Sequence, residues 1–178
     1  MWSRHRPLAW LGLMINLAAC GGAKLGSDGG AFAPAPWPPP DICGLLTFAD
    51  VQPLLPQVDS TSRPDPLTPA GGPYWIDGCD WGSQAAPGGV LQLSLTGALT
   101  PDGETALDRD VTYTDVDASV QTVSGVGTAA AYIDVPGRTQ SLTVRFKTYL
   151  ITLRARSFTA DVPETALQPL AVKVMGEL

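Results

Sequence analysis

The stretch SLTVRFKTYLITLRARS, residues Ser141–Ser157, alternates apolar and polar side chains twice in succession. Alternation with a period of two is typical of strands that bury one face, so the stretch predicts strands over Ser141–Lys147 and Tyr149–Ser157. Three arginines at polar positions are then expected to share a polar sheet face, or to extend from it so that only their charged ends are in water. They are Arg145, Arg154 and Arg156.

Further strands are expected earlier in the chain. The leucines of Val90–Thr96 occupy alternate positions, and Ala129–Val135 is also predicted as a strand. Cys79–Trp81 begins a strand, and Gly88–Gly89 predicts the hairpin turn that follows it. Two other segments are expected to be less regular: Tyr74–Ile76 as an edge or turn segment, and the proline-rich Gln57–Gly72 as a long loop.

Helices are expected at three places. Thr47 and Asp50 fit a capping pattern for a short helix that runs toward Leu54–Leu55. Asp102–Thr112 is expected to be a second helix. The third is C-terminal, where Leu167, Leu170, Val174 and Leu178 are spaced by three and four, with Pro169 kinking or starting it. The predicted fold class is α+β, a mostly antiparallel sheet covered by two helices in a single disulfide-bridged domain.

Residues 1–19 have the parts of a secretory signal peptide. Arg4 and Arg6 give a positive start, and Leu8–Ala19 is an apolar run too short to span a bilayer. Leu17–Cys20 reads LAAC and resembles the bacterial lipobox, in which the cysteine receives a diacylglyceryl group and becomes the new N-terminus. The alternative is an ordinary signal peptide that ends near a cysteine. We expect Cys20 to be the lipidation site, and acyl chains there to anchor the protein at the cell envelope after secretion across the cytoplasmic membrane.

Cleavage before Cys20 changes the charge and the chemistry of the chain. It removes Arg4 and Arg6, which leaves nine basic against 17 acidic residues and a net charge near −8. This charge disfavours nucleic acid and anionic membrane surfaces as direct partners. It also removes His5, the only histidine. Serine or cysteine nucleophiles activated by histidine and histidine-ligated metal sites are therefore excluded from the mature chain, and no cofactor is expected.

Cys43 and Cys79 form an even pair once Cys20 is assigned to lipid. Such a pair in a small domain outside the cytoplasm usually oxidises, so a disulfide is expected. A catalytic or metal-binding thiol is the alternative, but neither histidine nor a CxxC spacing supports it. Residues 20–41, rich in glycine and then in proline, predict a flexible tether whose second half is an extended stem. The globular domain is expected over residues 42–178.

Two motifs could carry chemistry but have simpler interpretations. Gly125–Ala130 reads GVGTAA and matches the letters of a dinucleotide-binding fingerprint, but no helix fits after it, so a tight turn between strands is expected. An acidic cluster is interpreted as a solvated loop, with a calcium site as the alternative. Its members are Asp108, Asp110, Asp115 and Asp117.

Aromatic side chains surround Cys79: Tyr74, Trp75 and Trp81. Aromatic residues beside a disulfide usually pack in the core. The alternative is an exposed aromatic patch that binds a small apolar or glycan ligand.

The segment DICGLLTFADV, Asp41–Val51, together with Cys79–Trp81, resembles a group of small actinobacterial lipoproteins classed as domain of unknown function 3558. Ser124–Ala130 and the C-terminal Ala166–Leu178 are also similar, so the resemblance covers most of the domain. It implies a disulfide between Cys43 and Cys79 and a location in the cell envelope, but no activity.

These features favour a non-enzymatic cell-envelope lipoprotein that binds a ligand or an envelope protein. One alternative is a structural or assembly factor of an envelope complex. Another is a cell-wall hydrolase that uses only carboxylates, which would need two acids flanking the scissile bond in a cleft. The ligand site would be a concave apolar pocket, and the assembly role would need a contiguous exposed patch.

Overall fold

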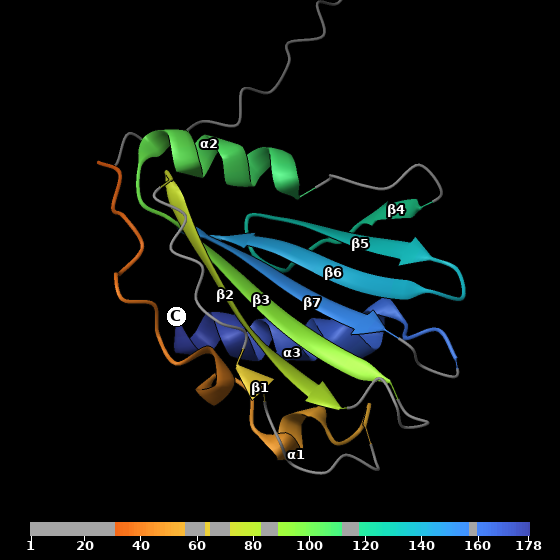
Figure 1. Cartoon of the computed structure of the whole chain (residues 1–178). Helices are drawn as coiled ribbons and strands as arrows, with labels where there is room; N and C mark the ends of the chain where they lie inside the picture. Colours follow the sequence, from red (N-terminus) through yellow and green to blue (C-terminus); the bar gives the residue numbers. More distant parts are fainter. Residues whose placement is uncertain (1–30, 56–62, 65–71, 83–88, 112–117, 157–159) are drawn as a thin grey trace, which may run out of the picture. The chain divides into compact units, whose positions relative to one another are not determined.

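The computed structural model describes residues 31–55, 63–64, 72–82, 89–111, 118–156 and 160–178. A compact unit runs from Phe32 to Leu178. Its strands form one antiparallel sheet in the order β1-β2-β3-β7-β6-β5-β4 (Figure 1). The strands are β1 (Arg63–Pro64), β2 (Tyr74–Gly82), β3 (Val90–Ala98), β4 (Ser119–Thr122), β5 (Ala129–Val135), β6 (Thr139–Phe146) and β7 (Tyr149–Arg156).

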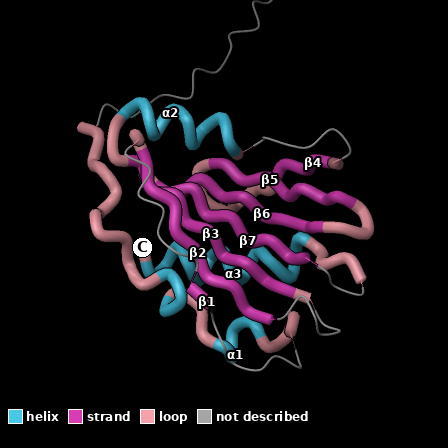
Figure 2. The backbone as a smooth tube through the Cα atoms, viewed as in Figure 1, coloured by secondary structure: helices cyan, strands magenta, loops and turns pink. Residues whose placement is uncertain are grey.

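Helices lie on both faces of this sheet. They are η1, a 3₁₀ turn (Ile42–Gly44), α1 (Phe48–Val51), α2 (Pro101–Asp110) and α3 (Glu164–Glu177). Figure 2 shows α2 at one end of the sheet and α3 behind the strands. The expected α+β fold with a mostly antiparallel sheet is confirmed.

The main core lies between the sheet and α3. The alternating leucines of β3 and the apolar positions of β6 and β7 are buried on this face. Leu167, Leu170 and Val174 of α3 pack on them, as the spacing of three and four predicts. Pro169 lies inside α3, and Pro163 precedes its first turn, so the helix does not begin at Pro169.

A smaller apolar cluster fixes α2 on the opposite face. Leu107 of α2 and Val111 just after it pack on Ala98, Ala131 and Leu150 of the sheet. Thr100 caps this helix, because its hydroxyl accepts a hydrogen bond from the Gly103 N–H at 3.2 Å. This helix therefore covers one end of the second sheet face.

The short helix α1 begins as its capping pattern predicts. The Thr47 N–H and hydroxyl both donate to Asp50 Oδ2, at 2.7 and 2.6 Å. Lys173 of α3 donates to Asp50 Oδ1 at 2.9 Å, so one carboxylate both caps α1 and joins it to α3. These contacts lower the pKa of Asp50, first through the Thr47 hydroxyl and next through Lys173.

Several local predictions need correction. Tyr74–Ile76 is no separate edge or turn segment, because β2 runs without interruption from Tyr74 to Gly82 and pairs with β3 along its whole length. Within the expected loop Gln57–Gly72, residues 63–64 form β1; most of the remainder lies outside the described residues. Gly88 of the expected hairpin turn also lies outside them.

The expected boundary at residue 42 moves to Phe32. Ala35 is 3% exposed, and its N–H donates to the Ala98 carbonyl at 2.8 Å. Phe32 packs against the cluster beneath α2. The prolines favour an extended chain, but Phe32 before them and Ala35 between two of them are apolar and lie against the rest of the domain. Residues 32–41 therefore belong to the folded body and are not a stem that stands away from it.

Candidate functional site

The disulfide predicted for the domain is present. Cys43 of η1 and Cys79 of β2 are joined, with their Cα atoms 5.3 Å apart. Cys79 is fully buried within the main core. The bond fastens the segment before α1 to the second strand of the sheet. Cys20, the predicted lipidation site, lies outside the described residues.

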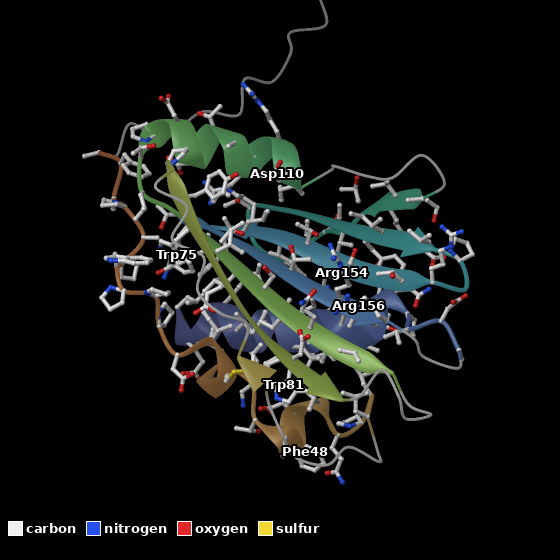
Figure 3. All side chains as sticks on the ribbon, in the orientation of Figure 1. Phe48, Trp75, Trp81, Asp110, Arg154 and Arg156 are labelled. Carbon is white, nitrogen blue, oxygen red and sulfur yellow. A yellow bond between two sulfur atoms is a disulfide. The ribbon has the colours of Figure 1, made fainter. Side chains whose placement is uncertain are left out.

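The tryptophans near the disulfide belong to the core. Trp75 is 1% exposed and Trp81 is also buried (Figure 3). Trp75 meets the Tyr149 ring edge-on with 6.1 Å between ring centroids, and its indole lies over Gly97, where a Cβ would approach the ring to 2.3 Å. Packing is thus confirmed for both tryptophans, and they form no exposed ligand patch. Burial also raises the pKa of Tyr149.

The glycine motif makes a turn, as expected. Gly125 and Gly127 have φ angles of +80° and +62°, and strand β5 begins directly after them at Ala129. The Thr128 N–H donates to the Arg145 carbonyl at 2.8 Å, which holds the turn against β6. A strand follows where a dinucleotide site needs a helix.

The acidic cluster is divided by the structure. Asp108 and Asp110 lie on α2, where Asp108 is paired with Arg145 and Asp110 is exposed at the helix end (Figure 3). Asp115 and Asp117 lie outside the described residues. Within the ranges that the structure describes, no group of three potential metal-ligating side chains occurs.

Arg145 is the buried centre of a charged network between β6 and α2. It is 5% exposed. Its Nη2 donates to Glu104 Oε1 at 2.9 Å and its Nε donates to Asp108 Oδ1 at 2.8 Å. Its Nη1 donates to the carbonyls of Lys147 and Tyr149. The alternating pattern correctly placed Arg145 on the polar face of the sheet, but it did not predict that this arginine is buried. The available sequence signal for a buried basic partner was the pair of acids Glu104 and Asp108, which lie one turn apart on the expected helix.

A second buried polar side chain, Gln140, joins β6 to the segment before α3. Its Nε2 donates to Asp134 Oδ1 at 3.0 Å and to Asp161 Oδ1 at 2.9 Å, and its Oε1 accepts from the Val162 N–H at 3.3 Å. The Tyr132 hydroxyl donates to the Val162 carbonyl at 2.6 Å. Burial, and next the nearby carboxylates, raise the pKa of Tyr132. This network positions α3 and was not indicated by the sequence pattern.

One part of the sheet remains accessible, and we call it the open face. It lies opposite α3, across β2, β3 and β7, beyond the end that α2 covers (Figure 1). Register assigns to it eight side chains: Ile76, Asp80, Gln92, Ser94, Thr96, Thr152, Arg154 and Arg156. Ile76 is 44% exposed, Arg154 is exposed, and the others are half-buried.

The arginines of the open face differ from Arg145 in their partners. Arg156 Nη2 lies 3.9 Å from Asp80 Oδ2, the outer limit of an ion pair, and its Nε has no hydrogen-bond partner among the described residues. The Arg154 side chain makes no ion pair or hydrogen bond within the part of the chain that the structure describes. Its guanidinium therefore retains the geometry for a carboxylate or phosphate ligand. This face is the candidate interaction surface.

Comparison with known proteins identifies no relative. No protein-family model, no curated protein and no solved structure matches this chain. The resemblance to the actinobacterial lipoproteins stays a prediction. Among the described helices, none is long and apolar enough to cross a membrane.

Proposed function

We propose that this chain is a lipid-anchored protein of the bacterial cell envelope, held at Cys20, that binds another envelope component without catalysing a reaction. The observation that carries the proposal is the Cys43–Cys79 disulfide. Disulfides persist mainly in oxidising compartments outside the cytoplasm, so this bond supports export of the domain.

The same bond accounts for two of the three cysteines, and Cys20 is the remaining one. Cys20 follows Leu17-Ala18-Ala19 at the end of an apolar leader. Two acyl chains on this cysteine give stable membrane attachment, whereas one chain binds only marginally, because each buried methylene contributes about 0.8 kcal/mol.

Binding is favoured over catalysis for two reasons. Removal of the leader takes away the only histidine, so the commonest general base is missing from the mature chain. The accessible surface that we identify is a strand face with arginine, hydroxyl and amide side chains. Such groups recognise a partner by hydrogen bonds and charge.

The proposal is tested by expressing the full chain in a bacterium that processes lipoproteins. Cells are fed an alkyne-tagged palmitate, and membranes are separated from the soluble fraction. The unchanged chain should carry the tag and sediment with membranes, while Cys20→Ser should do neither. The double variant Cys43→Ser, Cys79→Ser keeps Cys20 and should still be tagged, which controls for acylation at another thiol.

Two results would contradict the proposal. One is an unchanged membrane fraction and tag in Cys20→Ser. The other is a full-length product in the cytosol with residues 1–19 still attached.

A further inference from the structure

We propose that the open face binds an acidic segment of a protein partner, with Arg154 as the anchoring residue. This inference rests on the proposed binding function and names the site and the chemistry of the partner.

Register places Arg154 on β7, at the side of the open face that borders β6. It pairs with Gln92 of β3 on one side and with Ser141 of β6 on the other, and Gln92 pairs in turn with Asp80 of β2. Arg156 follows two residues later on the same strand and therefore points to the same side, about 7 Å away along the strand. Figure 3 shows both arginines on the sheet surface turned away from α3.

The charges on this sheet face are unevenly neutralised. Arg145 has two carboxylates, from Glu104 and Asp108. Arg156 has one distant carboxylate, from Asp80, and Arg154 pairs with none of the described acidic residues. Although the chain has a net charge of −6, Arg154 therefore gives the β7 side of the open face one positive charge that no described acidic side chain neutralises. A ligand that is complementary to it carries carboxylates.

The surroundings of Arg154 favour a protein over a sugar chain. The ring on this side of β2, β3 and β7 is that of Tyr74, which is half-buried at the end of β2 near α2, six register positions away from Arg154. A sugar chain bound at Arg154 would therefore have no described aromatic ring beside it on which to stack. The open face offers instead the hydroxyls of Ser94, Thr96 and Thr152 and the exposed apolar side chain of Ile76. Arginine is enriched among the residues that dominate protein–protein binding energies, and its guanidinium holds a carboxylate through two parallel hydrogen bonds.

The test uses the mature full chain, extracted from membranes in a neutral detergent, and fluorescent poly-L-glutamate as the probe. Affinity is measured by fluorescence anisotropy at low and at physiological salt. The variant Arg154→Gln is compared with Arg109→Gln, which removes one exposed positive charge from α2 and gives the same net charge. Thermal unfolding of each variant checks that the fold is kept.

We expect Arg154→Gln to weaken binding about fivefold or more, and Arg109→Gln to change it less than about twofold. Arg154→Lys should be intermediate, because an ammonium keeps the charge but loses the paired hydrogen bonds. Equal losses in Arg154→Gln and Arg109→Gln would overturn the proposal, since only net charge would then matter. No binding of poly-L-glutamate to the unchanged chain would also overturn it.

Two further probes identify the other classes of partner. Polygalacturonate presents carboxylates on a sugar chain, and vesicles containing phosphatidylglycerol present anionic lipid headgroups. Binding to either one that is tighter than to poly-L-glutamate and depends on Arg154 would reject the protein partner. The acylation test at Cys20 is independent of all these results, so failure of one proposal is distinguishable from failure of the other.

Discussion

Arg145 Nε on β6 lies 2.8 Å from Asp108 Oδ1 on α2, and this ion pair fastens the helix to the sheet. Glu104, one turn earlier, binds the same guanidinium at 2.9 Å. The arginine is buried while both acids reach solvent, so removal of the acids leaves a buried charge with only carbonyl partners.

The double variant Glu104→Ala, Asp108→Ala should lower the free energy of unfolding by about 2–3 kcal/mol, less than for a fully buried pair because the acids are partly hydrated. Urea denaturation measures the loss. Asp102→Ala removes an acid from the first turn of the same helix and is the control, with an expected loss below about 1 kcal/mol. Equal losses in the two variants would mean that the ion pairs contribute nothing beyond helix charge.

The Cys43–Cys79 disulfide closes a loop across 36 positions of the chain. On the chain-entropy account, the variant Cys43→Ser, Cys79→Ser should lose about 3–4 kcal/mol of unfolding free energy. Reduction of the unchanged protein should give the same urea midpoint as this variant. Mass spectrometry of the non-reduced protein should recover the two cysteines in one joined peptide, and finding both thiols free would contradict the structure.

Gly127 is required by both its conformation and its surroundings. Its φ is +62°, and a Cβ there would lie 2.3 Å from the Arg145 carbonyl oxygen and 2.6 Å from Val144 Cγ1. Gly125 has a φ of +80° but nothing within 4 Å of a Cβ. Gly125→Ala should therefore cost about 1 kcal/mol of conformational strain, and Gly127→Ala at least about 1 kcal/mol more because the turn must move. Matching thermal midpoints for the two variants would show that the close contact is relieved without cost.

Asp50 should make stability depend on pH in the acid range. Its pKa in the folded protein is lowered from the ordinary value of 3.8, first by the Thr47 hydroxyl and next by Lys173. Its contribution is therefore complete above about pH 3.8 and is lost as the pH falls through the lowered pKa. Asp50→Asn should be less stable than the unchanged protein at neutral pH, and the difference should shrink toward pH 2. Lys173→Met removes the contact with Lys173 but keeps the Thr47 hydrogen bond, so it should lower stability less than Asp50→Asn does. A stability difference between Asp50→Asn and the unchanged protein that stays constant with pH would contradict the lowered pKa of Asp50.

Alternation allowed β3, β6 and β7 to be predicted because each has one face in the main core and one face toward polar surroundings. The continuity of β2 was missed because Asp77, Gly78 and Asp80 interrupt the apolar pattern between Ile76 and Trp81. Strand β4 was missed because it has no apolar pattern to detect. All four of its side chains are exposed, so no buried face imposes a pattern.

The candidate surface was predicted only in part. The alternating pattern placed Arg145, Arg154 and Arg156 on one face, and register confirms this. The pattern could not predict that Arg145 is buried while Arg154 and Arg156 are not. The position of α2 over Arg145 depends on the long-range contacts of Leu107 with Ala98 and Leu150. The docking of Ala35 on Ala98 was missed for the same reason, since proline content reports local stiffness and not tertiary contact.

That docking limits how far an anchored body could travel. If Cys20 is held in lipid and the chain is fixed to the sheet from Phe32 onward, residues 21–31 alone are left to span the gap, and a fully stretched peptide of that length reaches about 40 Å. The domain would then stay close to the bilayer surface. Under this condition, a partner of Arg154 has to lie within about the length of the tether plus the width of the domain from the bilayer, which favours membrane-bound neighbours over more distant components.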